Sequence, residues 1–358
     1  MDKIRLGVVG YGLRGTSMFG LATRGFAEVT PAAICDASPQ AAERARADFP
    51  GVPVFSDFDE MLDAVALDAL LVETPATRHA DFCAKALLKG INVMGDVPSV
   101  ESVEQAQKLW DAQAASSAFY MMGANPNMWA FVQTAVDLKD QGLLGDPYLL
   151  EAEYVHDIRW LMALTPWRRT FEPILYCTHS LGPLLRLIDE DLVSVSCFDT
   201  GSHINKEPGQ HDAMMALFRT PSNVVVRVLT TFINSFPHWG HRYRVYGTKG
   251  YFERTPAYEG EGSAKTLFYS TGMYTDEALI ELPIHELRPE YRKIEHAVGH
   301  GGADYALFVR FFEAVRKGLS APINLREALR MTLPGIYAAE SARRGGELIQ
   351  IGYPWSEA

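Results

Sequence analysis

The sequence predicts an α/β domain with a parallel sheet, followed by an α+β domain with a large, mostly antiparallel sheet. Its length of 358 residues exceeds what one ordinary hydrophobic core accommodates. Strand-like and helix-like segments alternate before Gly123, and this alternation is typical of a parallel sheet covered by helices. Strand-like segments with few helices between them follow, as in an antiparallel sheet. We therefore expect one domain at residues 1–122 and a second at 123–323.

Apolar runs alternate with helix-forming segments in the first domain. Runs rich in Val, Ile and Leu predict buried strands at 4–9, 29–35, 68–74 and 91–94. Helix-forming composition predicts helices at about 13–27, 39–49, 79–89 and 102–115. Pro39 suits a first helical turn, and Gly90 suits the residue after a helix. The resulting β–α order is that of a parallel sheet.

The second domain is predicted from apolar runs separated by turn residues. These runs predict strands at 148–160, 193–198, 213–218, 224–232, 243–246 and 266–270. Asn223 and the segment 247–250 are expected in turns, and the glycine-rich segment 259–263 is expected to be a mobile loop. Few helices are expected between these strands.

Two helices are predicted near the end of the chain. Residues 304–317 have apolar side chains on one stripe, and Gly318 ends that segment. Asn324 is a suitable N-cap for a second helix that runs to about Arg343. Pro334 predicts a kink or a break within it.

Composition and charge exclude several classes of protein. A formal net charge of −11 with scattered basic residues argues against nucleic-acid binding. There is no apolar run of the ~20 residues that span a bilayer, and the start has no basic-then-apolar leader, so we expect a cytoplasmic protein. The four cysteines form no CxxC pair and are expected to be reduced, and no spacing typical of metal ligands occurs.

A glycine motif follows the first predicted strand. Gly10, Gly12 and Gly15 form GxGxxG between a strand and a helix. In that context, the glycines permit a tight turn, approach of a pyrophosphate and close helix packing, which is the signature of a Rossmann dinucleotide site. Asp36 ends the second strand, where a carboxylate can bind both ribose hydroxyls and would repel the extra phosphate of NADP. We therefore expect NAD; the plainer alternatives are an ordinary turn and a solvated strand end.

Further motifs resemble the Gfo/Idh/MocA oxidoreductases over nearly the whole chain. They are Glu73-Thr74-Pro75 with His79 after it, and Gly95-Asp96-Val97-Pro98 where the family usually has Glu-Lys-Pro. The resemblance implies a Rossmann domain, a C-terminal open-faced sheet, an active site at their junction and a closing helix at about 324–345 that returns to the first domain. It also implies a homodimer or tetramer. The implied cofactor-binding residues are Gly10, Tyr11, Gly12, Leu13, Arg14, Gly15, Asp36, Thr74, Pro75, His79, Asp96 and Val97.

One branch, glycoside hydrolase family 109, is more similar than the rest of the family. The similarity lies in the segments 154–160, 167–169, 176–183 and 299–304. That branch uses NAD to cleave glycosides, with α-N-acetylgalactosaminidase as its known activity. This chain departs from its pattern at Cys177, Ser180 and Asp96, where the branch has proline, glycine and glutamate.

The resemblance implies catalytic roles for His179, Tyr176 and Asp96. The usual family lysine is replaced by Val97, so another acid/base is needed, and imidazole titrates near neutral pH. Redox-assisted cleavage would oxidise C3 of the sugar, deprotonate C2, eliminate the group on C1, add water and reduce C3 again. The alternatives are an ordinary sugar or polyol dehydrogenase and a non-catalytic dinucleotide sensor.

A small sugar-like substrate is the expected partner. The residues expected to bind it are His156, Asp157, Arg159, Trp160, Arg168 and His300. Each of them has a structural alternative: the polar residues can pair with each other, His300 can belong to a glycine turn, and the tryptophan can close the core.

Overall fold

The fold is described by a computed structural model covering residues 3–235, 240–256, 264–273, 278–285, 289–297 and 299–356. The loop expected at 259–263 lies outside these ranges. The chain divides into two compact units, which are described separately. Unit 1 comprises Met1–Met128 and Leu287–Leu329, and unit 2 comprises Trp129–Glu286 and Arg330–Ala358.

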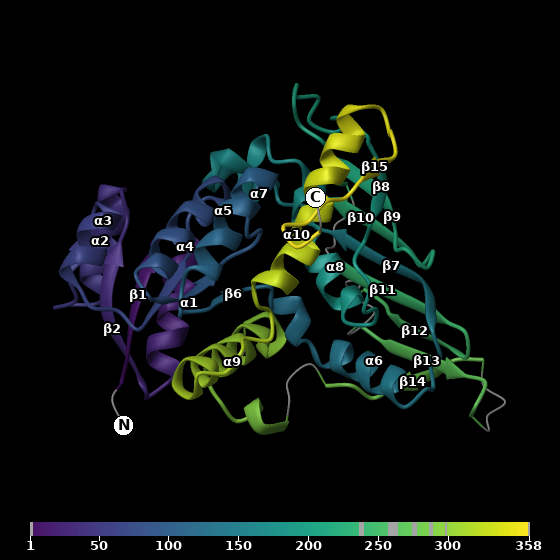
Figure 1. The fold of residues 1–358 in the computed structure, drawn as a ribbon, viewed down its shortest axis with the longest axis horizontal. Coiled ribbons are helices and arrows are strands. Elements are labelled where there is room, and N and C mark those ends of the chain that lie inside the picture. Colours follow the sequence, from purple (N-terminus) through teal and green to yellow (C-terminus); the bar gives the residue numbers. More distant parts are fainter. Residues whose placement is uncertain are drawn as a thin grey trace. The chain divides into compact units, whose positions relative to one another are not determined.

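Unit 1 is an α/β unit in which strands and helices alternate along the chain (Figure 1). Its strands are β1 (Ile4–Val9), β2 (Val29–Cys35), β3 (Val54–Phe55), β4 (Ala69–Val72), β5 (Asn92–Gly95) and β6 (Tyr120–Met122). Its helices are α1 (Leu13–Gly25), α2 (Pro39–Asp48), α3 (Phe58–Ala64), α4 (His79–Leu88), α5 (Val103–Ala114) and α9 (Ala303–Lys317).

The strands of unit 1 form one parallel sheet of six strands in the order β3-β2-β1-β4-β5-β6. The order reverses direction between β1 and β4. Right-handed crossovers that run in opposite directions place α1 and α4 on opposite faces of the sheet. The carboxyl ends of β1 and β4 therefore flank the switch point where open α/β sheets bind ligands.

Helix α9 belongs to unit 1 by its packing. Phe308 and Phe312 contact the ring of Phe26 at centroid distances of 6.1 and 5.1 Å, and Phe311 contacts Phe119 at 5.7 Å. The division therefore differs from the expected one, which placed this helix in the second domain. Its apolar stripe is the physical reason, because that stripe completes the core of the first unit.

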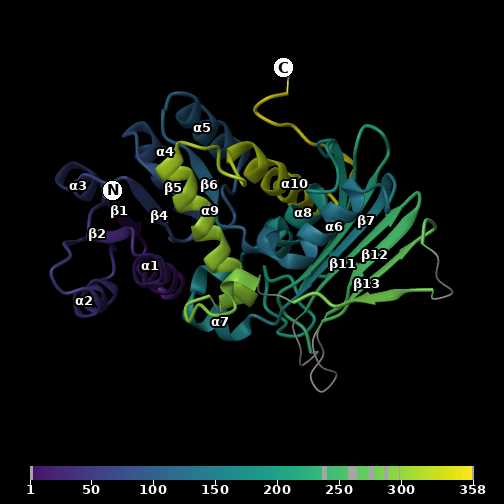
Figure 2. The same cartoon turned by 90° about the horizontal axis from the view of Figure 1, so that it is seen from below.

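Unit 2 contains a second sheet and helices (Figure 2). Its strands are β7 (Pro147–Val155), β8 (Ser194–Asp199), β9 (Ala213–Arg219), β10 (Val225–Thr231), β11 (Gly240–Gly247), β12 (Gly250–Arg254), β13 (Thr266–Ser270), β14 (Ile280–Leu282) and β15 (Ile349–Gln350). Its helices are α6 (Ala130–Asp140), α7 (Arg159–Leu164), α8 (Thr178–Leu185) and most of α10 (Leu325–Arg343).

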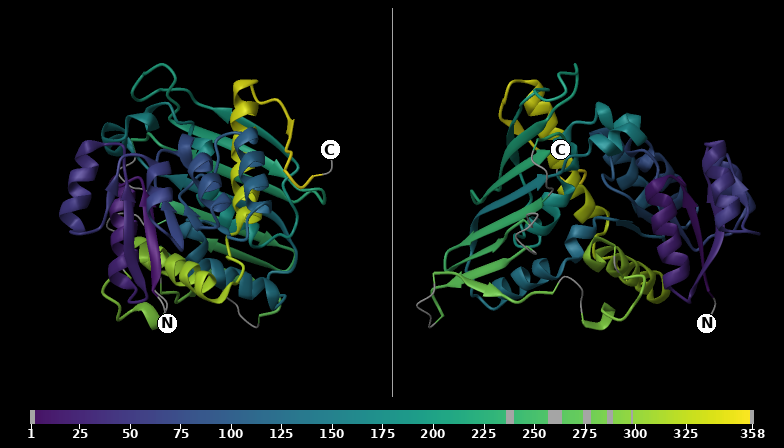
Figure 3. Two further views of the ribbon diagram at one scale, coloured as in Figure 1. Left: turned by 60° about the vertical axis from the view of Figure 1, so that its left-hand side comes forward. Right: turned by 180° about the vertical axis from the view of Figure 1, so that it is seen from behind.

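This sheet has nine strands in the order β14-β13-β12-β11-β7-β10-β9-β8-β15. Only the pairing of β10 with β7 is parallel among the described strands of this sheet. Helices α6 and α8 lie on one face, and no described helix of unit 2 covers the other (Figure 3). The predicted fold class, a parallel Rossmann sheet plus a large open-faced antiparallel sheet, is confirmed.

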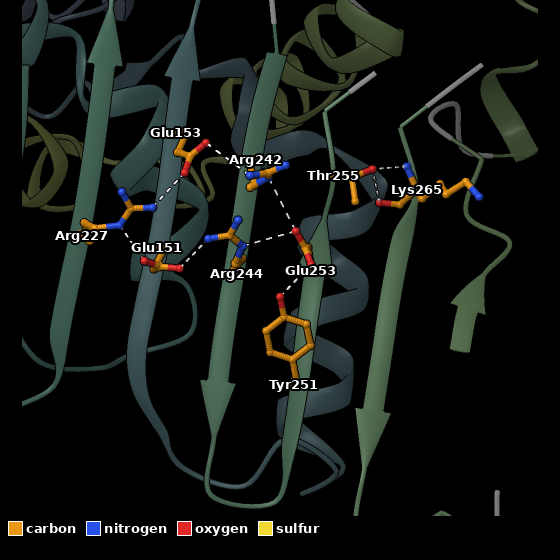
Figure 4. Close-up of polar contacts among 9 residues, drawn as sticks. All are labelled: Glu151, Glu153, Arg227, Arg242, Arg244, Tyr251, Glu253, Thr255 and Lys265. Carbon is orange, nitrogen blue, oxygen red and sulfur yellow. Dashed lines mark hydrogen bonds and ion pairs between the residues drawn. The ribbon is translucent and has the colours of Figure 1, made fainter. Parts of the chain in front are cut away.

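The uncovered face of this sheet holds a network of alternating charges, which we call the sheet-face network (Figure 4). Glu151 of β7 binds Arg227 at 2.6 Å and Arg244 at 2.9 Å. Arg244 continues to Glu253 at 3.3 Å. The complete network comprises Glu151, Glu153, Arg227, Arg242, Arg244 and Glu253. Pairing across neighbouring strands compensates these charges locally.

Two local predictions need correction. The strand predicted at 148–160 ends at Val155, and α7 begins at Arg159 because the Asp157 carboxylate accepts the Arg159 N–H at 3.1 Å. Pro334 predicted a kink or a break; α10 continues through it to Arg343, so the helix has no break there, and the kink stays a prediction. Asn324 accepts the N–H of Glu327 at 3.2 Å and starts that helix as predicted.

The closing helix, expected to return to the first domain, is divided between the two units, and its residues Leu325–Leu329 group with unit 1. Its residues from Arg330 onward group with unit 2. Arg330 is buried and binds Asp191 at 2.8 Å, and Gly335 lies so close to Cys177 that a Cβ there would be 2.7 Å from its sulfur. No helix within the described ranges is long and apolar enough to cross a membrane.

Candidate active site

The glycine turn of unit 1 has the backbone that a dinucleotide site requires. Gly10 has φ +90°, and a Cβ there would lie 2.6 Å from the carbonyl oxygen of Glu73. A Cβ on Gly15 would lie 1.9 Å from the carbonyl oxygen of Gly10, so α1 packs against the turn only with glycine there. No atom lies within 4 Å of the position that a Cβ on Gly12 would take, and no side-chain hydrogen bond caps the start of α1. The first N–H groups of α1 are thus available to a phosphate.

Asp36 lies beside the same turn. Its carboxylate accepts the N–H of Tyr11 at 2.6 Å and that of Ser38 at 2.8 Å. Because a carboxylate has about four acceptor positions, the ribose hydroxyls can still bind. Tyr11 is 1% exposed and donates its hydroxyl to Asp48, so only its backbone can contact a cofactor. The Leu13 side chain, by contrast, is 59% exposed.

Arg14 joins the glycine motif to the last predicted motif, 299–304. Its guanidinium binds both oxygens of Asp304, at 3.0 and 3.2 Å. The amide of Asn125 and the ring of His300 also contact this carboxylate, at 3.0 and 2.6 Å. Burial alone would raise the pKa of Asp304, but the charge of Arg14 and these hydrogen bonds hold it well below its ordinary value. The Asp304 carboxylate is therefore ionised.

Glu73 and Asp96 complete this group, which we call the Asp304 cluster (Arg14, Glu73, Asp96, Asn125, His300 and Asp304). The Nε of Arg14 lies 3.9 Å from Asp96. Glu73 follows β4, and its Oε2 is buried without a hydrogen-bond partner among the described residues. Burial and the nearby charge of Asp96 raise the pKa of Glu73 well above its ordinary value.

His79 and the segment around it hold the neighbouring loops. Its ring nitrogens lie 2.7 Å from the Thr74 carbonyl oxygen and 2.8 Å from that of Pro98. With 1% exposure, His79 offers no surface to a ligand, and we expect it to act on the cofactor only through these loops. Val97 is also buried, whereas Pro75 is exposed.

The predicted catalytic residues of unit 2 lie together at the start of α8. The rings of Tyr176 and His179 are 4.5 Å apart between centroids. The Tyr243 hydroxyl donates to the carbonyl oxygen of His179 at 2.7 Å and fixes the backbone there. Both His179 and Tyr176 remain partly exposed, as reacting side chains must. Tyr176 also packs on the apolar cluster formed by Tyr154, Ile158, Met162, Phe232 and Ile233.

His156 is linked to Tyr176 and His179 by Tyr154, which contacts all three. The Tyr154 ring contacts His179 at 5.7 Å and Tyr176 at 5.5 Å, and its hydroxyl lies 2.8 Å from Nδ1 of His156. His241 approaches the same ring at 4.7 Å. We call these residues the imidazole cluster (Tyr154, His156, Tyr176, His179 and His241).

The other predicted substrate residues of unit 2 are more exposed. Asp157 and Arg159 form an ion pair, which lowers the pKa of Asp157 against the effect of burial. Trp160 is 59% exposed on α7. Arg168 stacks over the ring of Trp167 at 4.1 Å, so the sugar-facing role expected for it competes with this contact.

Sequence reasoning missed Asp304, Asn125, Tyr154 and His241 as site residues. Asp304 stands four residues after His300, and this spacing puts it in reach of that ring. Tyr154 of β7 stands two residues before His156, which directly follows that strand, and this is a period-2 spacing. His241 and Asn125 carry no local signal, because their neighbours come from distant parts of the chain. His300 was expected in the second domain but belongs to unit 1.

Comparison with known families agrees with the geometry of both units. Residues 4–124 match the model of the oxidoreductase family with an NAD-binding Rossmann fold. Residues 132–253 match the GFO/IDH/MocA C-terminal domain. The glycine turn, the free α1 N-terminus and Asp36 fit NAD, which is the cofactor. Within the described residues, no group of three or more His, Cys, Asp or Glu side chains could hold a metal ion.

Individual proteins are similar over most of the chain. A glycosyl hydrolase family 109 protein from Saccharopolyspora erythraea is 24% identical, covering 96% of this chain and 81% of that protein. One from Streptomyces niveus is 27% identical, covering 98% and 77%. A levoglucosan dehydrogenase solved with NADH and levoglucosan has a TM-score of 0.82 at 18% identity, covering 98% of this chain and all of that one. This last likeness is one of fold.

Proposed function

The chain belongs to the Gfo/Idh/MocA oxidoreductase family and is an NAD-dependent enzyme, and we propose that it cleaves glycosides by a redox-assisted route. Unit 1 would hold the cofactor and unit 2 the sugar. The observation that carries this proposal is the pairing of Tyr176 with His179 while Val97, a buried apolar residue, stands at the usual lysine position. The similarity to family 109 proteins supports it.

The residues of this chain would move protons rather than electrons. NAD, when bound, supplies acceptance and return of a hydride at C3 of the sugar. His179 would take the proton of the C3 hydroxyl or of C2, and Tyr176 would share that proton or polarise the C3 oxygen. Asp96 would orient a sugar or nicotinamide group, with its charge offset by Arg14 at 3.9 Å. No pair of carboxylates flanking the scissile bond is needed, unlike in ordinary glycosidases.

The test is release of nitrophenol from para-nitrophenyl α-N-acetylgalactosaminide and a panel of related aryl glycosides, by the protein as purified and without added NAD. We expect turnover without net NADH, and loss of turnover by at least ~100-fold in His179→Ala. The control variant is His203→Ala, which alters a histidine outside the imidazole cluster. Failure across the panel, with steady NADH formation from free sugars, would contradict the proposal.

A second candidate is an ordinary sugar or polyol dehydrogenase. It is favoured by the likeness in fold to levoglucosan dehydrogenase, which was solved with NADH and its sugar. This function predicts one NADH formed per free sugar oxidised, and the same loss in His179→Ala. The stoichiometry of NADH therefore separates the two candidates.

We also propose that the protein acts in the cytoplasm as a homodimer or tetramer, joined through the part of the uncovered sheet face that β8 and β9 form. Phe198, Met215 and Leu217 are 63%, 42% and 51% exposed on strands β8 and β9, which supports an apolar contact there. Light scattering tests the assembly, and Leu217→Arg should yield monomers. A monomeric wild-type protein would contradict this part.

A further inference from the structure

Tyr154 lies at the centre of the imidazole cluster. It comes from β7 and is 6% exposed, on the face of the sheet that its buried neighbours Ala152 and Leu150 share. Aromatic side chains approach its ring from separate elements: His179 from α8 at 5.7 Å and His241 from β11 at 4.7 Å. A ring enclosed in this way has one orientation, and its hydroxyl is therefore aimed by packing.

The hydroxyl of Tyr154 lies 2.8 Å from Nδ1 of His156. Burial raises the pKa of Tyr154 well above its ordinary value, although the charge of Arg168 opposes this. The phenol therefore keeps its proton at neutral pH. A buried O–H needs an acceptor, and among the described residues Nδ1 of His156 is the acceptor within reach. This makes the phenol the donor and the imidazole nitrogen the acceptor.

A neutral imidazole carries one N–H. When Nδ1 accepts a hydrogen bond, the proton of the ring resides on Nε2. The His156 side chain is only partly buried. The adjacent charge of Asp157 is already paired with Arg159, through contacts that include 2.9 Å from Nε to Oδ1. The phenol is the group that contacts Nδ1, at 2.8 Å.

We propose that Tyr154 is a positioning residue that fixes His156 as the Nε2–H tautomer, so that His156 donates a hydrogen bond to an oxygen of the bound sugar. That oxygen is a hydroxyl or an acyl carbonyl oxygen. The inference rests on the proposed function, in which His179 is the base. The two imidazoles of the cluster then have different roles: His179 accepts a proton, and His156 donates a hydrogen bond.

Nitrogen NMR of the full-length protein with ¹⁵N-labelled histidine tests the tautomer without any substrate. The protein has ten histidines, and the signal of His156 is assigned by its loss in His156→Gln. We expect Nδ1 of His156 to resonate as an unprotonated acceptor and Nε2 as a protonated nitrogen. In Tyr154→Phe the second tautomer should appear. A wild-type signal with the proton on Nδ1 would overturn the proposal, whether or not the variant folds.

Kinetics test the consequence for the substrate. With the aryl glycoside or sugar that the wild-type protein turns over, Tyr154→Phe should raise KM about 10-fold and change kcat less than about 2-fold, as expected for loss of one hydrogen-bond donor. Tyr251→Phe is the matched control, since its hydroxyl binds Glu253 at 2.7 Å on the uncovered sheet face (Figure 4). An unchanged KM in Tyr154→Phe, with a tautomer like that of the wild type, would refute the role.

The two proposals fail separately. If no glycoside or sugar is turned over, the proposed function fails, while the histidine spectrum still decides whether Tyr154 sets the tautomer. If turnover occurs but His156 carries its proton on Nδ1, the proposed function stands and the positioning role is wrong.

Discussion

The Asp304 cluster of unit 1 and the sheet-face network of unit 2 use the same residue types in different settings. In the first, one carboxylate of 5% side-chain exposure receives Arg14, Asn125 and His300. In the second, each carboxylate meets arginines on neighbouring strands and retains contact with water, as Glu151 does with 15% exposure. In the Asp304 cluster several partners bind one carboxylate, whereas in the sheet-face network the ion pairs are spread over several carboxylates and arginines.

Removing Asp304 removes the shared partner of its whole cluster, whereas removing one residue of the sheet-face network leaves other ion pairs in place. A buried charge whose partner is removed keeps its desolvation cost, which amounts to several kcal/mol. Charges at a wet surface are screened, and a neighbouring pair can take over. The buried arrangement joins the glycine turn to the motif 299–304, and we expect it to fix the positions of these side chains. The sheet-face network instead pairs charged side chains across a wide polar face of the sheet.

The largest expected effect is that of Asp304→Asn. Losing the carboxylate leaves Arg14 without its main partner, and we expect the free energy of unfolding in urea to fall by about 3 kcal/mol. The exposed Asp48→Asn is the control and should cost less than 1 kcal/mol. Because the pKa of Asp304 is depressed, its contribution is present above its ordinary value of 3.8 and is lost on acidification below it. If Asp304→Asn lowered the free energy of unfolding no more than Asp48→Asn does, the contrast between the buried cluster and the exposed network would be contradicted.

The second effect is a pH dependence that belongs to the Asp304 cluster alone. The pKa of Glu73 is raised, so its favourable contribution is complete below its ordinary value of 4.5 and declines as pH rises toward the native pKa. Glu73→Gln cannot ionise and should gain stability relative to wild type by about 1.4 kcal/mol per pH unit within that window. Urea unfolding at several pH values measures the difference. A difference independent of pH would mean that Glu73 is ionised in the native state.

The smallest effect is expected in the sheet-face network. Glu151→Gln removes charge from two arginine contacts and should cost about 1 kcal/mol at low salt. Added salt should reduce that penalty, whereas the penalty of Asp304→Asn should persist because its site is buried. The free energy of unfolding of each variant, measured at low and high ionic strength, gives both penalties. Equal salt sensitivity of the two variants would show that burial does not distinguish these regions.

Local order along the chain was readable from the residues themselves. The spacing Gly10, Gly12, Gly15 predicted a turn before a helix, and Gly10 indeed has φ +90°. Apolar runs predicted a parallel sheet and a mostly antiparallel sheet in outline, with helices at 39–49 and 304–317 close to their observed bounds. These features depend on neighbours in sequence, so pattern alone suffices.

Boundaries and packing partners were less accessible. The strand predicted to reach Trp160 ends at Val155, because the Asp157 carboxylate favours a helix start by accepting the N–H of Arg159. The last helix was expected to return to the first domain; its residues to Leu329 group with unit 1, and from Arg330 onward it groups with unit 2, where Arg330 binds Asp191. Such contacts join residues far apart in the chain, and propensity does not encode them.

By itself, the sequence determined the fold class, the glycine turn with Asp36, and the nearness of Tyr176 to His179, since each follows from short-range spacing. Only the tertiary structure decided that Arg14 and His300 share the carboxylate of Asp304, that burial raises the pKa of Glu73, and that Tyr154 contacts His156 and His241 together. The physical reason is that protonation and orientation depend on burial and on neighbours in space, which the fold alone brings together.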